Sequence, residues 1–234
     1  MKDLKNSFLP LLVLLSLAFS AGCQQPPSPI SLLVAFDATT SSRTLQPEQV
    51  RFAKTLSNEG LQAGRESISL SVYAFGPPDT RLVIDTTQVR EVSELATLDD
   101  VIAKVPPTVW GKTRWHPMLR ELLTKVKLSA QPVVVYFASD GEIHDLEVAK
   151  QLARELVAHP NVRGVVVGPA TNALTQAQIE LLRDTPGAKL DGQPQGVQMR
   201  KQMDELFGTA SPKVVVFDQN NTETALERAR ELLK

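Results

Sequence analysis

The sequence contains the stretch Ser31-Leu-Leu-Val-Ala-Phe-Asp37-Ala-Thr39-Thr-Ser41, an apolar run that ends in an acid and then in hydroxyl side chains. A continuous apolar run of this kind is typical of a strand buried on both faces of a parallel sheet. Open α/β sheets bind their ligands beyond the carboxyl ends of such strands. Asp37, Thr39 and Ser41 lie two residues apart, so an extended loop turns their oxygens toward one point. The stretch therefore predicts a buried strand followed by the first part of a site for a hard cation.

The rest of the chain alternates short apolar runs with segments of helical periodicity. Strands are predicted at 68–75, 81–84, 133–138, 162–167 and 214–217, helices at 46–56, 95–105, 118–126, 146–157, 175–183, 199–207 and 225–233, and mostly loop at 186–196. Parallel strands need crossover helices, so this alternation predicts an α/β fold with a mostly parallel sheet and helices on both faces. The run 81–84 follows a turn and is expected to be an antiparallel edge strand.

The N-terminus has the features of a secretory signal peptide. Lys2 and Lys5 precede a short apolar run over 8–19, and small residues follow at 20–22. The apolar run is too short to span a bilayer, so residues 1–22 are expected to be a cleaved signal rather than an anchor helix.

The only cysteine, Cys23, follows this segment directly. Ala21-Gly22-Cys23 resembles the lipobox of bacterial lipoproteins, which implies that Cys23 becomes the lipidated first residue, with palmitate among its acyl chains. By the same resemblance, Gln24 in place of Asp suggests the outer membrane of the cell envelope. Residues 23–29 form a proline-rich spacer that holds the domain close to the membrane, in the periplasm or at the cell surface. The alternative is an ordinary cleaved signal with an incidental free thiol.

Charge and composition limit the functions that this chain can have. The formal net charge is −1 at pH 7, which argues against nucleic-acid binding because such binding needs a basic surface. Aromatic residues make up only 5% of the chain, so the core must be mainly aliphatic. The length after the signal peptide fits one α/β domain over 30–234.

Two further oxygen donors are expected beside the opening stretch. Asp140 follows the predicted strand 133–138, and Thr113 lies in the loop Gly111-Lys112-Thr113 before a helix. With Asp37, Thr39 and Ser41 they make five donors that include two carboxylates. This set suits Mg²⁺, or Mn²⁺ or Ca²⁺, with room for water or an external ligand.

These residues resemble the von Willebrand factor type A (vWA) domain and its metal-ion-dependent adhesion site (MIDAS). The family motif Asp-x-Ser-x-Ser is matched by Asp37-Ala-Thr39-Thr-Ser41, the threonine loop by Gly111-Lys112-Thr113, and the Asp-Gly pair by Asp140-Gly141. The resemblance implies a three-layer Rossmann-like fold. It also implies that the hydroxyls of Thr39, Ser41 and Thr113 bind the metal directly or through water, that Asp37 and Asp140 coordinate it or orient water, and that a partner's carboxylate completes the shell.

Simpler interpretations exist for each residue alone. Asp37 could cap a helix and Asp140-Gly141 could be only a turn. The only two tryptophans, Trp110 and Trp115, flank Thr113 and are candidates for direct contact with a partner. The alternative for one or both is packing beneath the loop.

The leading functional hypothesis is a membrane-anchored, non-enzymatic binding module that uses a divalent cation to engage an acidic group on a protein partner. One alternative is a Mg²⁺-dependent phosphate hydrolase, which resembles Asp-x-Asp-x-Thr enzymes, although position 39 is threonine rather than the acid needed for proton transfer. A second alternative is a metal-free scaffold with the same fold.

Overall fold

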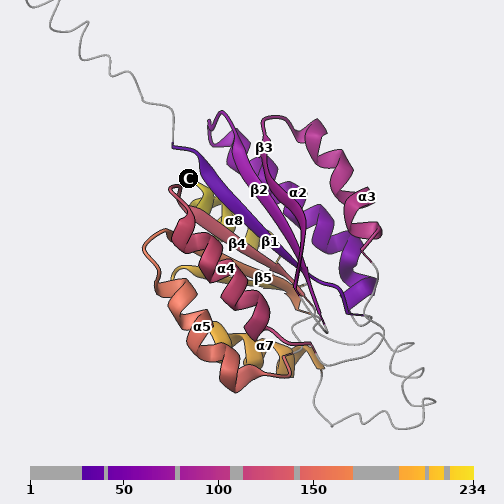
Figure 1. Ribbon diagram of the computed structural model, residues 1–234, viewed down its shortest axis with the longest axis vertical. Helices are drawn as coiled ribbons and strands as arrows, with labels where there is room; N and C mark the ends of the chain where they lie inside the picture. Colours follow the sequence, from indigo (N-terminus) through magenta and orange to yellow (C-terminus); the bar gives the residue numbers. More distant parts are fainter. Residues whose placement is uncertain are drawn as a thin grey trace, which may run out of the picture.

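A computed structural model describes residues 28–39, 42–76, 80–105, 113–139, 143–170, 195–208, 211–218 and 222–234. Its centre is a sheet with the strand order β3-β2-β1-β4-β5-β6 (Figure 1). The strands are β1 (Ile30–Asp37), β2 (Ile68–Phe75), β3 (Arg81–Val89), β4 (Val133–Ala138), β5 (Val162–Ala170) and β6 (Val214–Asp218). Only the pairing of β2 with β3 is antiparallel. The predicted α/β class and the antiparallel edge strand are confirmed.

Helices cover both faces of this sheet, as the alternating pattern predicted (Figure 1). One face carries α4 (His116–Leu128), α5 (Leu146–Ala158) and α7 (Gln195–Phe207), and the other carries α2 (Gln46–Gln62), α3 (Thr97–Ala103) and α8 (Thr222–Leu233). Short 3₁₀ turns, η1 (Ser42–Leu45) and η2 (Val92–Ala96), precede α2 and α3. The result is a three-layer α/β/α domain.

Strand β1 is buried on both faces. Leu33 and Ala35 pack in the core beneath α4 and α5, whereas Leu32, Val34 and Phe36 pack in the core beneath α2. Successive side chains of a strand point to opposite faces, so a strand between two helical layers needs an apolar residue at every position. This is the physical reason for the uninterrupted apolar run.

Several element bounds differ from the sequence prediction. Strand β3 continues to Val89 instead of ending at residue 84, because an edge strand tolerates the exposed polar residues Asp85 to Thr87. The predicted helix 95–105 is divided between η2 and α3, which ends at Ala103. Helix α7 begins at Gln195, so the end of the expected loop 186–196 is helical. The predicted helix 175–183 lies outside the described residues.

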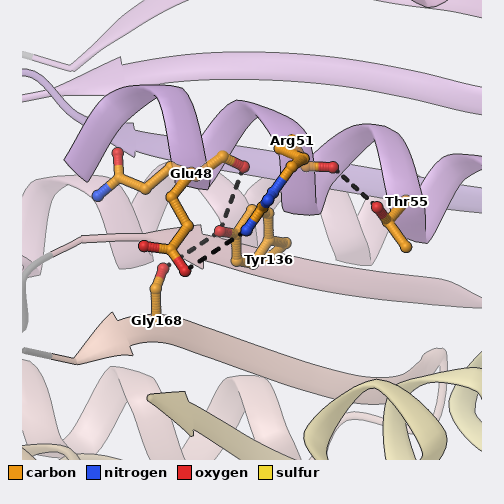
Figure 2. A network of polar contacts seen from close by, with 6 residues as sticks. Glu48, Arg51, Thr55, Tyr136 and Gly168 are labelled. Carbon is orange, nitrogen blue, oxygen red and sulfur yellow. Dashed lines mark hydrogen bonds and ion pairs between the residues drawn. The ribbon is translucent and has the colours of Figure 1, made fainter. Parts of the chain in front are cut away.

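Tyr136 joins three elements at the carboxyl end of the sheet, the end at which β1 and β4 stop. Figure 2 shows this residue beneath α2. Its hydroxyl donates to the carbonyl oxygen of Gly168 in β5 at 3.2 Å and lies 3.4 Å from that of Gln49 in α2. Burial, together with the charge of Glu48, raises the pKa of Tyr136 well above 10, so the hydroxyl stays neutral. Gly168 has φ +148°, and a Cβ there would lie 2.5 Å from the carbonyl oxygen of Phe217. The carboxyl end of the sheet is therefore closely packed around Tyr136 and Gly168.

Among the described residues, no helix combines the length and the apolar character needed to cross a membrane.

Candidate functional site

Asp37 ends β1 with a buried carboxylate, which is only 6% exposed. Its Oδ1 accepts hydrogen bonds from the backbone N–H of Thr39 at 2.9 Å and from the Thr39 hydroxyl at 2.6 Å. Its Oδ2 accepts a bond from the hydroxyl of Ser139 at 2.9 Å. A buried carboxylate is costly unless hydrogen bonds satisfy it, and these three donors hold it in one orientation.

A small pocket of about 20 Å³ lies beside this carboxylate, lined by Asp37, Thr39 and Gln46 among others. A cavity of this volume holds about one water molecule. Polar side chains at its wall supply the hydrogen-bond partners that an ordered water needs.

Thr113 lies just before α4 and is 1% exposed. Its backbone carbonyl accepts a hydrogen bond of 3.0 Å from the backbone N–H of His144, in the connection between β4 and α5. The same connection begins with Ser139, which contacts Asp37. Ser139 and His144 are five positions apart in the sequence, a length of chain that spans at most about 18 Å. Asp37, Thr39 and Thr113 therefore lie at the same end of the sheet.

The structure tests the remaining site predictions only in part. It brings Asp37 and Thr39 into direct contact and places Thr113 against the β4–α5 connection. The predicted ligands Ser41 and Asp140, the lipidation residue Cys23 and the predicted contact residue Trp110 lie outside the described residues. Their roles stay predictions.

Trp115 is not available to a partner, so the prediction of direct contact is wrong for this residue. It is fully buried, and its ring lies 4.9 Å from Phe137, 5.4 Å from Phe75 and 5.9 Å from Phe207, measured between centroids. Burying a large aromatic surface is favourable, and these three partners come from two strands and α7. Trp115 therefore belongs to the core on the face of the sheet that α4, α5 and α7 cover.

Sequence reasoning missed two residues of this region. Ser139 precedes Asp140 directly, and its position after an apolar strand was the available signal. Asp145 accepts hydrogen bonds from the backbone N–H groups of Trp115 and His116, at 2.8 and 2.9 Å. The partners are 30 and 29 positions away in the sequence, so no local pattern could have revealed this contact.

The donors fit a hard cation better than a soft one. Within the described ranges, no group of three or more His, Cys, Asp and Glu side chains is placed to hold a metal. The described donors are one carboxylate and two hydroxyls, from Asp37, Thr39 and Thr113, all buried. Oxygen ligands of this kind suit Mg²⁺, Ca²⁺ or Mn²⁺, whereas zinc prefers histidine and thiolate.

No family model matches the sequence. The fold is nevertheless similar to solved structures. Proximal thread matrix protein 1 from the mussel byssus superposes with a TM-score of 0.55 at 12% identity, over 89% of this chain and 47% of that one. The VWA domain of SpRpn10 superposes with a TM-score of 0.50 at 11% identity, over 80% of this chain and 86% of that one. An aerotolerance-related membrane protein from Bacteroides fragilis gives 0.52 at 14% identity, over 87% and 98%. Another structure of the mussel protein has a zinc-occupied MIDAS motif, with a TM-score of 0.54 at 14% identity, over 97% and 52%.

The chain thus has the fold of a vWA domain, with a mostly parallel six-stranded sheet between two helical layers. The resemblance to vWA domains that the motifs indicated is confirmed at the level of the fold. Identities of 11 to 14% establish the architecture alone.

One curated protein shows limited sequence similarity. Replication factor C small subunit 2 of Pyrobaculum aerophilum is 26% identical over 148 residues, which cover 60% of this chain and 44% of that protein. The chain thus spans less than half the length of that relative. Gly111-Lys112-Thr113 has the last three residues of the phosphate-binding pattern G-x-x-x-x-G-K-[ST], but the first glycine is replaced by Pro106. A nucleotide site is therefore not inferred.

Proposed function

We propose that this chain is a non-enzymatic binding module that uses a divalent cation, Mg²⁺ foremost, to bind an acidic group of a protein partner. The observation that supports this most is the buried Asp37 carboxylate, oriented by the hydroxyls of Thr39 and Ser139 at the carboxyl end of the sheet. Ligands of open α/β sheets bind at this end.

The proposed ligands are Asp37, Thr39, Ser41, Thr113 and Asp140. Two carboxylates balance the charge of one divalent cation, and hydroxyls contribute oxygens without further charge. A cation held in this way keeps an affinity for an external carboxylate, because its coordination shell is not filled by anionic protein ligands. The bound cation would supply the positive charge, and the chain would orient the oxygens.

The position of Thr39 supports binding rather than phosphate transfer. In the hydrolase alternative, the residue two positions after the aspartate must donate or accept a proton. Here that residue is a threonine whose hydroxyl donates to Asp37 Oδ1 at 2.6 Å. An alcohol with this hydrogen bond is a poor general acid at neutral pH.

Ser28, where the described chain begins, and the proposed cation site lie at opposite ends of β1. Arg65 is buried, and its guanidinium donates to the carbonyl of Ser28 and to that of Leu233, the latter at 2.8 Å from Nη2. These bonds hold the chain that leads from the spacer into β1. Seven residue steps of about 3.3 Å separate Ile30 from Asp37, so the ends of the strand are about 23 Å apart. A domain anchored through Cys23 would present the site away from the membrane.

Calorimetric titration with Mg²⁺ tests the proposal, using a soluble form in which Cys23→Ser removes the lipidation residue. Asp37→Ala should abolish the binding heat. Asp85→Ala is the matched control, because Asp85 is an exposed carboxylate on β3. Equal Mg²⁺ affinity of the parent and Asp37→Ala would refute the proposed site. A crosslinking pull-down from membranes, with and without chelator, then tests whether partner capture needs the cation.

A further inference from the structure

The side chain of Asp145 caps a helix to which it does not belong. Its Oδ1 accepts from the backbone N–H of Trp115 at 2.8 Å, and its Oδ2 accepts from the N–H of His116 at 2.9 Å. These N–H groups lie at the start of α4, where helical N–H groups have no partner within the helix. A carboxylate is also favoured there by the helix dipole.

The backbone of Asp145 starts a second helix. Its carbonyl accepts from the N–H of Val148 at 3.1 Å and from that of Ala149 at 2.9 Å, in the first turn of α5. Its side chain makes no capping bond to α5. One residue therefore fixes the start of α4 and the start of α5 relative to each other.

The two connections that Asp145 joins each carry a proposed cation ligand. Thr113 is two residues before Trp115, and Asp140 is five residues before Asp145. The bond from the N–H of His144 to the carbonyl of Thr113, 3.0 Å long, ties the same two connections a second time. Three hydrogen bonds therefore hold Thr113 and the start of α4 in place relative to His144 and Asp145.

Trp115 limits the remaining freedom of this region. Its indole is fully buried and stacks on Phe137 of β4, with centroids 4.9 Å apart. The carboxylate bonds from Asp145 hold the backbone N–H groups at Trp115 and His116, and the ring contact holds the side chain. The backbone that directly follows Thr113 is therefore held both by hydrogen bonds to Asp145 and by the packing of the Trp115 ring.

We propose that Asp145 is a positioning residue for the cation site: its carboxylate holds the start of α4, and with it Thr113, in place relative to the start of α5. The inference rests on the proposed function, because it concerns the same cation. In this proposal Asp145 acts through the backbone N–H groups of Trp115 and His116 and is not itself a ligand of the cation.

The decisive comparison is between Asp145→Asn and Glu147→Gln. Each removes one negative charge from the same open depression beside α4, which both residues line. Only Asp145→Asn places an amide NH₂ against a backbone N–H and so breaks one of the two capping bonds. The Glu147 side chain is 81% exposed and forms an ion pair with Lys150. We expect Asp145→Asn to weaken Mg²⁺ binding about tenfold, which corresponds to about 1.4 kcal/mol, and Glu147→Gln to weaken it less than threefold.

A second control separates positioning from simple stabilisation of α4. Asn161 holds the other end of this helix, where its Nδ2 donates to the carbonyl of Ser129 at 2.9 Å. Asn161→Ala and Asp145→Ala should both lower the Tm, but only Asp145→Ala should weaken Mg²⁺ binding. If Asp145→Ala does not fold, Asp145→Asn still decides the comparison.

The calorimetric titration distinguishes the positioning role of Asp145 from the proposed function itself. Loss of Mg²⁺ affinity in the Asp145 variants, with parent-like affinity in Glu147→Gln and Asn161→Ala, supports positioning. Affinity of Asp145→Asn equal to that of Glu147→Gln overturns positioning and leaves the proposed function intact. A parent protein that binds no Mg²⁺ overturns both.

Discussion

Replacing Asp37 with asparagine separates the charge of this residue from its hydrogen bonds. The amide oxygen can still accept from the N–H and hydroxyl of Thr39, which bond to Oδ1 in the parent. The amide nitrogen takes the place of Oδ2 and donates to the Ser139 hydroxyl, which can accept as well as donate. Without a divalent cation, we therefore expect the free energy of unfolding to stay within about 1 kcal/mol of the parent value, the typical net worth of one hydrogen bond.

The response of the two proteins to Mg²⁺ should differ. A cation that binds only the folded state adds about 2.7 kcal/mol to stability at 100 times its Kd. For a domain of this size, that gain raises the Tm by about 5 to 11 °C. Asp37→Asn removes one of the two carboxylates that balance the cation, so this gain should vanish at the same Mg²⁺ concentration.

Urea unfolding followed by circular dichroism measures the free energy of unfolding in EDTA and its increase in excess Mg²⁺. Asp85→Asn serves as the control, because the side chain of Asp85 is 77% exposed on the edge strand. Equal stabilisation of the parent and Asp37→Asn by Mg²⁺ would show that the cation does not bind at Asp37. A loss of more than about 3 kcal/mol in EDTA would show that the amide does not replace the carboxylate hydrogen bonds.

Three further predictions concern the core, the tyrosines and the anchor. Trp115→Ala should cost about 3 to 5 kcal/mol in urea unfolding, because the ring is fully buried against three aromatic partners; a loss below about 1 kcal/mol would contradict this packing. Burial, with the charges of Glu121 and Asp85, raises the pKa of Tyr73 to about 12, and the pKa of Tyr136 is also raised. Both pKa values are higher in the folded than in the unfolded state, so this contribution to stability is complete below pH 10 and is lost as the pH rises toward 12. An ultraviolet titration should detect little phenolate in the folded protein at about pH 11, since unfolded tyrosines ionise near pH 10; full ionisation without unfolding would refute the burial argument. Cys23→Ser should move the protein from the membrane fraction to the soluble fraction, as judged by immunoblotting, and retention in the membrane would refute lipid anchoring.

The order of strands and helices was readable from the sequence because it depends on local periodicity. The run before Asp37 could only belong to a strand covered on both sides, and the structure buries it in two cores. Strand β3 was predicted too short for the opposite reason. At the edge of the sheet its polar residues Asp85, Thr86 and Thr87 stay exposed, so the apolar signal stops while the backbone pairing with β2 continues.

The residues of the site were readable where they belong to a local sequence motif. Asp37 and Thr39 share one local motif, and the structure brings them together as expected. Trp115 stands beside Thr113 in the sequence, but its burial depends on rings from β2, β4 and α7. Its neighbours in sequence therefore gave no sign that it belongs to the core.

The sequence by itself determined the class of fold and the chemistry of the donors, because hydrophobic periodicity and residue type are local properties. It specified a buried strand that ends in an acid and hydroxyls, and this stretch became the end of β1. Only the tertiary structure decided which distant groups hold those donors. Ser139 meets Asp37 across 102 positions, and Asp145 meets the start of α4 across about 30. Such contacts depend on the order of the parallel strands in the sheet. That order places the ends of β1 and β4 side by side, although the chain between them passes through two other strands.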